Sequence, residues 1–171
     1  VKIYNGSNLL GSATADSNGD FSITLSTLSD GTYSLTATAT DVSGNTSPSS
    51  SALSITVDTT APTAPSSLTT ASSASDITPT ITGIAEIGST VKIYNGSKLL
   101  GSATADSNGG FTITSSALAD GSYSLTATAT DSAGNTSSTS SACSILMSSS
   151  PEEQDQVRLA IIIKAKIFFM V

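Results

Sequence analysis

One stretch of the sequence occurs twice, at residues 28–41 and again at 118–131, and in both copies its side chains alternate between two kinds. In the second copy Tyr123, Leu125, Ala127 and Ala129 are separated by single serines or threonines. A period of two is typical of a β-strand that has one face on an apolar core and the other in water. The stretch therefore predicts a long, half-buried strand in each copy.

The residues before each strand predict how it begins. Asp30 and Asp120 each precede a glycine, and Tyr33 and Tyr123 follow two residues after that glycine. Asp-Gly is a tight-turn dipeptide, so we interpret both aspartates as turn residues. A tyrosine at this spacing can bury its ring and bond its hydroxyl back to the turn backbone. This is the tyrosine corner of immunoglobulin-like sandwiches, and it predicts an all-β fold of antiparallel sandwiches.

The whole chain repeats at a constant offset of 90 residues: Val1–Ser7 recurs as Val91–Ser97, and most positions of 1–57 match those of 91–147. A period of this length fits a tandem array of self-contained sandwich domains. We predict a complete repeat at 58–147 and an incomplete one at 1–57. The remaining residues, 148–171, leave the repeat pattern.

Turn signals divide the complete repeat into seven expected strands. They are placed near 67–71, 80–85, 90–94, 98–105, 111–115, 122–130 and 140–146, with Asn95–Gly96 as a hairpin signal. The predicted core consists of Ile81, Val91, Ile93, Leu100, Phe111, Ile113, Leu118, Tyr123, Leu125, Ala127 and Ile145.

The first copy begins at the third of these strands, so the equivalents of the first two are missing from its start. We interpret this as truncation of a longer array, and we expect 1–57 to be poorly stable because half of its core is missing. Two prolines, Pro62 and Pro65, make the connector between the copies stiff and extended.

The segment 157–171 is apolar, with Lys164 and Lys166 inside it, and it is too short for a membrane-spanning helix. Three interpretations stay open: an unnatural or frame-shifted end, an additional strand on an exposed sheet edge, and a tail that contacts a membrane.

Charge and composition limit the partners. The net charge of −7 arises within residues 1–150, where acidic residues outnumber lysines ten to three. An acidic surface argues against nucleic acid and anionic membrane as partners, and is compatible with bound divalent cations. The chain has no histidine and a single cysteine, Cys143, which we interpret as a small buried hydrophobic residue and not a reactive thiol. With no phosphate-binding loop and no serine paired with a base, we predict that the protein is not an enzyme.

Several motifs together resemble the bacterial Ig-like repeats of giant surface adhesins. They are the segments 79–85, 88–94, 101–106, 120–131 and 133–137, with Val57-Asp-Thr-Thr-Ala-Pro between the copies. The resemblance covers residues 1–147. It implies a secreted or cell-surface protein involved in biofilm formation or attachment, in which such repeats serve as extenders and have neighbouring repeats of the same chain as partners. It also implies calcium at the domain junctions of some members.

A calcium site is the one ligand site that the residues suggest. In an Ig-like sandwich the loops that carry Glu86, Asp106 and Asp131 lie at the end where the first strand begins, and the connector brings Asp58 there. Calcium takes six to eight oxygen ligands, which carboxylates and loop carbonyls can supply. Asp58, Glu86 and Asp131 are therefore candidate calcium ligands. Asp106 is a weaker candidate, because Asp106-Ser-Asn-Gly is also an ordinary turn sequence.

Three functions stay open at this stage. The first is a passive stalk, or extender, of a surface adhesin, which we favour. The second is a binding module that recognises a glycan or protein, although the aromatic side chains Tyr4, Tyr33, Tyr94, Tyr123, Phe21 and Phe111 do not suggest a flat sugar-binding face. The third is a calcium-responsive spacer.

Overall fold

The computed structural model describes residues 1–71 and 76–148, and the expectations for the tail at 148–171 fall almost wholly outside them. The chain divides into two compact units between Thr60 and Ala61, three residues after the boundary that the repeat predicts. The regular elements of the described residues are all β-strands, and every strand pair is antiparallel. The predicted fold class is confirmed.

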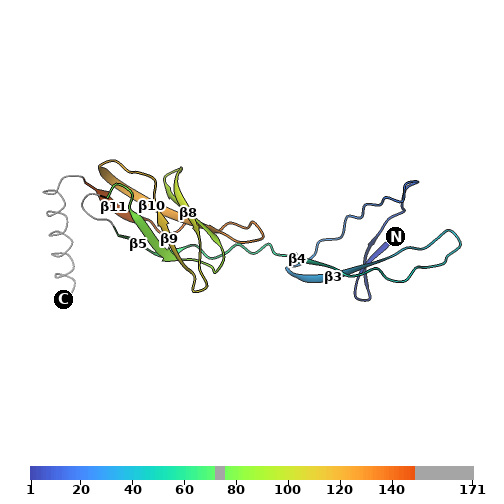
Figure 1. The fold of residues 1–171 in the computed structure, drawn as a ribbon. Helices are drawn as coiled ribbons and strands as arrows, with labels where there is room; N and C mark the ends of the chain where they lie inside the picture. The colour runs from blue at the N-terminus through green and yellow to red at the C-terminus, as the bar shows by residue number, and fades with distance from the viewer. Residues whose placement is uncertain (72–75, 149–171) are drawn as a thin grey trace. The chain divides into compact units, whose positions relative to one another are not determined.

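The second unit is a sandwich of two sheets (Figure 1). One sheet has the strand order β11-β10-β7-β8 and the other β5-β6-β9. The strands are β5 (Ser66–Ala71), β6 (Thr80–Ile84), β7 (Thr90–Asn95), β8 (Lys98–Thr104), β9 (Gly110–Thr114), β10 (Gly121–Thr130) and β11 (Cys143–Met147). All seven predicted strands are present. The last strand, β11, begins three residues later than expected, because Ser137 and Ser140 bond to the second half of β10 where a longer strand would pair.

The hairpin between β7 and β8 forms one residue later than the sequence suggests. Asn95 pairs with Lys98, so the two loop residues are Gly96 and Ser97 and not Asn95 and Gly96. Gly96 has a φ of 58°, a left-handed conformation that glycine adopts without steric cost. Glycine at the first loop position is the preference of a type II′ turn, which suits the twist of the flanking strands.

The two sheets enclose one apolar core, and it contains all the predicted core residues. Ile81, Val91, Ile93, Leu125 and Ala127 are fully buried, and the Tyr123 ring packs against them from a half-buried position. Burial along β10 alternates residue by residue, as its period of two predicts. Cys143 differs from expectation: it is half-buried, opposite Leu125 at the start of the edge strand β11.

Buried serines complete the edge of β10. Strand β11 pairs with only the first half of β10, up to Leu125. Beyond it the Ala127 amide donates to Ser140 Oγ at 2.9 Å, and the Ala129 amide donates to Ser137 Oγ at 2.9 Å. The Ser140 and Ser137 amides in turn donate to the Ala127 and Ala129 carbonyl oxygens. These serines therefore satisfy backbone groups that would otherwise be buried without partners.

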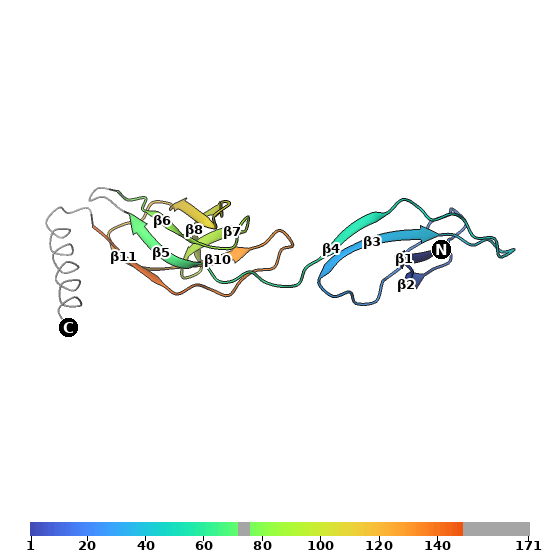
Figure 2. The ribbon, with the colours of Figure 1, turned by 90° about the horizontal axis from the view of Figure 1, so that it is seen from below.

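The first unit is a single sheet of order β2-β1-β3-β4. Its strands are β1 (Lys2–Asn5), β2 (Asn8–Ser12), β3 (Gly31–Thr38) and β4 (Leu53–Val57), the counterparts of β7, β8, β10 and β11 (Figure 2). The counterpart of β9, residues 20–24, is not a strand. In the second unit β9 pairs only with β6, and the first unit has no equivalent of β6. Residues 20–24 therefore have no strand to pair with within the described residues.

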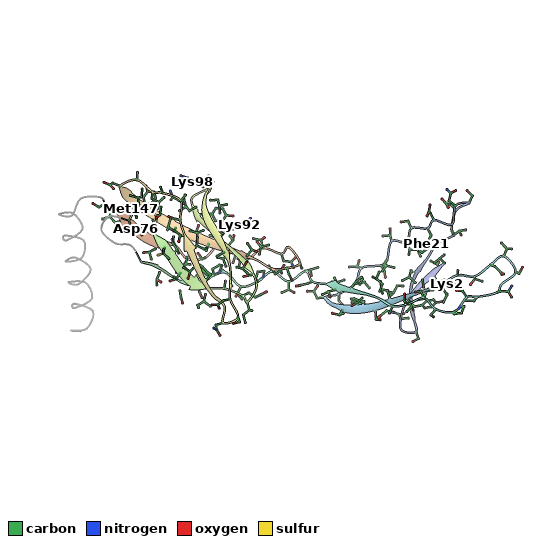
Figure 3. All side chains as sticks on the ribbon, in the orientation of Figure 1. Lys2, Phe21, Asp76, Lys92, Lys98 and Met147 are labelled. Carbon is green, nitrogen blue, oxygen red and sulfur yellow. The ribbon has the colours of Figure 1, made fainter. Side chains whose placement is uncertain are left out.

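Packing in the first unit is correspondingly incomplete. Leu35 is its one buried hydrophobic residue among the described residues, at 8 % exposed. Phe21, labelled in Figure 3, is 48 % exposed, whereas Phe111 at the equivalent position is 4 % exposed. The two phenylalanines differ because only Phe111 has β6 beside it, with Gly83 opposite its backbone and close to its ring.

Candidate functional site

Both tyrosine corners have the predicted geometry. The Tyr123 hydroxyl donates to the Ala119 carbonyl oxygen at 2.9 Å, and the Tyr33 hydroxyl donates to the Ser29 carbonyl oxygen at 2.8 Å. Each bond spans four residues and closes the turn before the longest strand of its unit. In both repeats the tyrosine hydroxyl bonds to the backbone of its own turn, so these tyrosines have a structural role.

Asp30 does more than form its turn, which corrects the sequence interpretation. Its carboxylate accepts hydrogen bonds from the amide and hydroxyl of Thr59, at 3.0 and 2.7 Å, and from the hydroxyl of Thr60 at 2.6 Å. The bonds from Thr60 and Thr59 hold the pKa of the Asp30 carboxyl below its ordinary value of 3.8. Strand pairing explains the contact: Gly31 lies opposite Val57, so Asp30 faces the residues that follow β4. Asp30 thus anchors the beginning of the connector.

The loops that carry the acidic candidates do gather at one end of the second unit. Ile84 pairs with Gly110, Thr90 pairs with both Thr104 and Thr130, and Ser66 pairs with Ile84. The ends of β6, β8 and β10 therefore lie with the start of β5, as the sandwich topology predicts. Asp120 precedes Gly121, which pairs with Met147, and so lies at the other end.

The Asp131 carboxylate is bonded within its own loop. One oxygen accepts the amides of Ala133 and Asn135, both at 2.9 Å, and the other accepts the Asn135 side-chain amide at 2.9 Å. The bond from the Asn135 side chain is the main cause that keeps the pKa of Asp131 below 3.8. Asp41 and Asn45 form the same arrangement in the first unit. The same Asp–Asn hydrogen bonds therefore stabilise the turn in both loops.

The other candidates also show turn geometry. Asp106 accepts the amides of Asn108 and Gly110, at 2.8 and 2.9 Å, and Asp58 accepts the Thr60 amide at 3.0 Å. At the exposed Glu86, the main-chain oxygen accepts the amide and hydroxyl of Ser89. Among residues 1–71 and 76–148, no three His, Cys, Asp or Glu side chains are grouped so that they could hold a metal ion. The turn explanation accounts for the local bonds of Asp106 and Asp131.

In the part of the chain that the structure describes, no helix has the length and apolar character needed to cross a membrane.

Comparison with known proteins identifies the family. Residues 1–59 and 66–146 both match the bacterial Ig-like domain family. The chain belongs to the bacterial Ig-like domain family. Each match falls within one of the two compact units, so each unit contains one bacterial Ig-like repeat, and the described residues of the first have no strands equivalent to β5 and β6.

Two solved structures resemble this chain at low sequence identity. Fibronectin(III)-like modules of Clostridium thermocellum CbhA are 18 % identical, with a TM-score of 0.50, over 85 % of this chain and 76 % of that one. A structure described as the BSP domain of a biofilm-associated protein is 24 % identical, with a TM-score of 0.43, and covers 88 % of this chain. This chain spans a quarter of the length of that BSP structure, 25 %. No curated protein matches the sequence.

Proposed function

We propose that these bacterial Ig-like repeats are a non-catalytic stalk, or extender, of a large bacterial surface or secreted adhesin. One observation carries the proposal: in the complete repeat the chain enters at one end of the sandwich and leaves at the other. Repeats joined in this way add length with each copy.

Strand pairing establishes the two ends. The chain enters at Ser66, which pairs with Ile84 beside the loop that carries Glu86. It leaves at Met147, which pairs with Gly121 at the start of β10 (Figure 2). Strand β10 runs the length of its sheet, from Gly121 to Thr130, so these two ends are far apart along it. A stalk needs this separation.

The connector supports the same function. The Asp30 carboxylate fixes Thr59 and Thr60 to the end of the first unit, and Pro62 and Pro65 restrict the backbone that follows. An anchored, proline-containing connector has fewer conformations than a flexible one. Such a connector limits the free rotation of one repeat against the next.

The family and the adhesin-like motifs support a location outside the bacterial cell, with neighbouring repeats of the same chain as partners. The acidic surface, with a net charge of −7, suits a soluble, extended protein and does not favour nucleic acid. The adhesion target would be bound by another part of such a protein.

A concatemer series tests the stalk function directly. Chains with two, four and six copies of residues 58–147 are compared by small-angle X-ray scattering. An extender predicts a maximum dimension that grows by a constant step per repeat. Growth with the cube root of chain length, as for a compact particle, would exclude it. Specific binding of a single repeat to a glycan array would instead favour a recognition module.

We further propose that calcium is the one ligand of the repeat, with Asp58, Glu86 and Asp131 as candidate ligands and Asp106 as a weaker one. The acidic loops at the start of β5 support it. Extracellular calcium modules bind with a dissociation constant of ~10⁻⁴–10⁻³ M, so the titration must reach millimolar calcium. Calcium should raise the melting temperature, Asp58→Ala should abolish the rise and Asp120→Ala should not. Identical melting curves in calcium and in chelator would reject the site.

A further inference from the structure

The sequence contains four Asn-Gly dipeptides, at Asn5-Gly6, Asn18-Gly19, Asn95-Gly96 and Asn108-Gly109. In such a dipeptide the glycine amide nitrogen can attack the asparagine side chain, because glycine has no side chain to hinder the approach. In a folded chain the reaction also requires a glycine amide that is free to move and an asparagine side chain that is free to turn toward it. The structure separates the four sites by these two requirements.

Two of the glycine amides are held by their turns. The Gly109 amide donates to the Asp106 carbonyl oxygen at 2.9 Å, and the Gly19 amide donates to the Asp16 carbonyl oxygen at 3.1 Å. Gly109 is also buried, and a Cβ added there would lie 2.7 Å from the Ala85 carbonyl oxygen. At both sites the attacking nitrogen is therefore engaged, and at Gly109 it has no room to move.

The dipeptide at the tip of the β7–β8 hairpin is free in both respects. Gly96 is exposed, and a Cβ added there would meet nothing within 4 Å. Within the described residues, neither the Gly96 amide nor the Asn95 side chain makes a hydrogen bond. The equivalent hairpin of the first repeat differs, because there Asn5 Oδ1 accepts the Ser34 amide at 3.3 Å. Of the four asparagines, Asn95 is the one whose side chain and following amide are both unrestrained.

We propose that Asn95-Gly96 is a self-modification site, at which the chain deamidates without an enzyme. The Gly96 nitrogen gives up its proton to the solvent and forms a bond to Asn95 Cγ. The Cγ–Nδ2 bond breaks, and ammonia leaves with a proton from water, so that a cyclic succinimide remains. Water then opens the ring. Cleavage of the bond between Cγ and the Gly96 nitrogen gives aspartate, and cleavage at the main-chain carbonyl of residue 95 gives isoaspartate. The only co-reactant is water, and nothing is oxidised or reduced.

The two products differ in their effect on the hairpin. Asn95 lies directly opposite Lys98, so the aspartate product forms a cross-strand pair of opposite charges. Isoaspartate also adds a negative charge, but it inserts an additional methylene into the backbone. The two-residue loop suits the twist of its strands only at its present length, so this product should loosen the pair of residues 95 and 98. The proposal does not depend on the stalk function.

The test follows the intact 171-residue chain during incubation in mildly alkaline buffer. Peptide mapping by mass spectrometry measures deamidation at each asparagine, and an isoaspartate-specific methyltransferase used as a reagent detects isoaspartate. We expect Asn95 to react first of the four. Asn108 should react at least about tenfold more slowly, because its buried turn must first open.

Two controls assign this difference to the structure. In concentrated denaturant the four dipeptides should react at similar rates, because every turn is lost. Asp106→Ala removes the carboxylate that accepts the Asn108 and Gly110 amides, so the rate at Asn108 should rise while the rate at Asn95 stays the same.

Three results would overturn the proposal. One is an equal rate at Asn95 and Asn108 in the folded chain. Another is an intact Asn95 after a time in which the denatured chain is fully converted. A third is a preference for Asn95 that persists unchanged in denaturant, which would assign it to the flanking sequence and not to the hairpin.

Discussion

The hydroxyl of Thr60 donates a 2.6 Å hydrogen bond to the carboxylate of Asp30, and so ties the connector to the turn that begins β3. Asp30 lies in that turn because Asp-Gly favours it, and the pairing of β3 with β4 brings the connector to it. Asp30 therefore both forms the turn before β3 and holds the beginning of the connector.

Removing this carboxylate should release the connector. In Asp30→Ala, the amide of Thr59 should exchange faster, because it loses the carboxylate that accepts its hydrogen bond, while β3 itself stays protected. Asp20→Ala is the matched control, because it removes an exposed carboxylate that makes no hydrogen bond with any residue the structure describes. Unchanged exchange at Thr59 in Asp30→Ala would show that the anchor is not maintained in solution.

The same anchor should respond to pH. The pKa of Asp30 is lowered in the folded state, so its stabilising contribution is present above the ordinary value of 3.8 and is lost as the pH falls through the lowered value. The amide shift of Thr59 should therefore be constant at neutral pH and titrate below pH 3.8. In Asp30→Asn the titration should disappear.

The tyrosine corner predicts a defined loss of stability. Tyr123→Phe keeps the ring and removes the hydroxyl that donates to Ala119, so it should lower the free energy of unfolding of the second repeat by about 1 kcal/mol. Tyr94→Phe is the control, since within the described residues the Tyr94 hydroxyl makes no hydrogen bond. Chemical denaturation gives both values, and equal stability of the two variants would argue against the corner.

The two buried serines beside β10, Ser137 and Ser140, should contribute to the stability of the second repeat. Ser140→Ala leaves the buried Ala127 amide without its acceptor, which should cost about 1–3 kcal/mol of unfolding free energy. Ser138→Ala changes an exposed side chain in the same loop and should be nearly neutral. If both substitutions were neutral by chemical denaturation, water must replace the Ser140 hydroxyl.

Much of this fold can be predicted from the sequence because its signals are local. The alternation around Leu125 defines β10, and the Asp-Gly-x-Tyr pattern defines the corner at Tyr123. The serine bonds could not be predicted in the same way. Ser137 and Ser140 look like ordinary exposed residues, and their burial depends on where β11 ends.

The candidate site was harder to predict, because its geometry depends on pairing between distant residues. The contact between Asp30 and Thr59 follows only from the register of β3 and β4. The Asp131–Asn135 pair repeats as Asp41–Asn45, and this repetition was a usable sequence signal for a locked turn. The calcium assignment of Asp58, Glu86 and Asp131 stays a prediction.

The exposed Phe21 offers a direct proteolytic contrast. Chymotrypsin should cleave after Phe21 well before it cleaves after Phe111, because the two side chains are 48 % and 4 % exposed. Mass spectrometry of a limited digest identifies the first cut. Simultaneous cleavage at both sites would mean that the first repeat is as well packed as the second.

The central claim is that two nearly identical repeats differ because only one has a strand beside its Phe-x-Ile segment. Residue-resolved hydrogen exchange of the intact chain tests it most directly. We predict that the amides of β9 that bond to β6 exchange only through global unfolding of the second repeat, whereas those at residues 20–24 exchange at rates close to an unstructured chain. Equal protection of both segments would contradict the account.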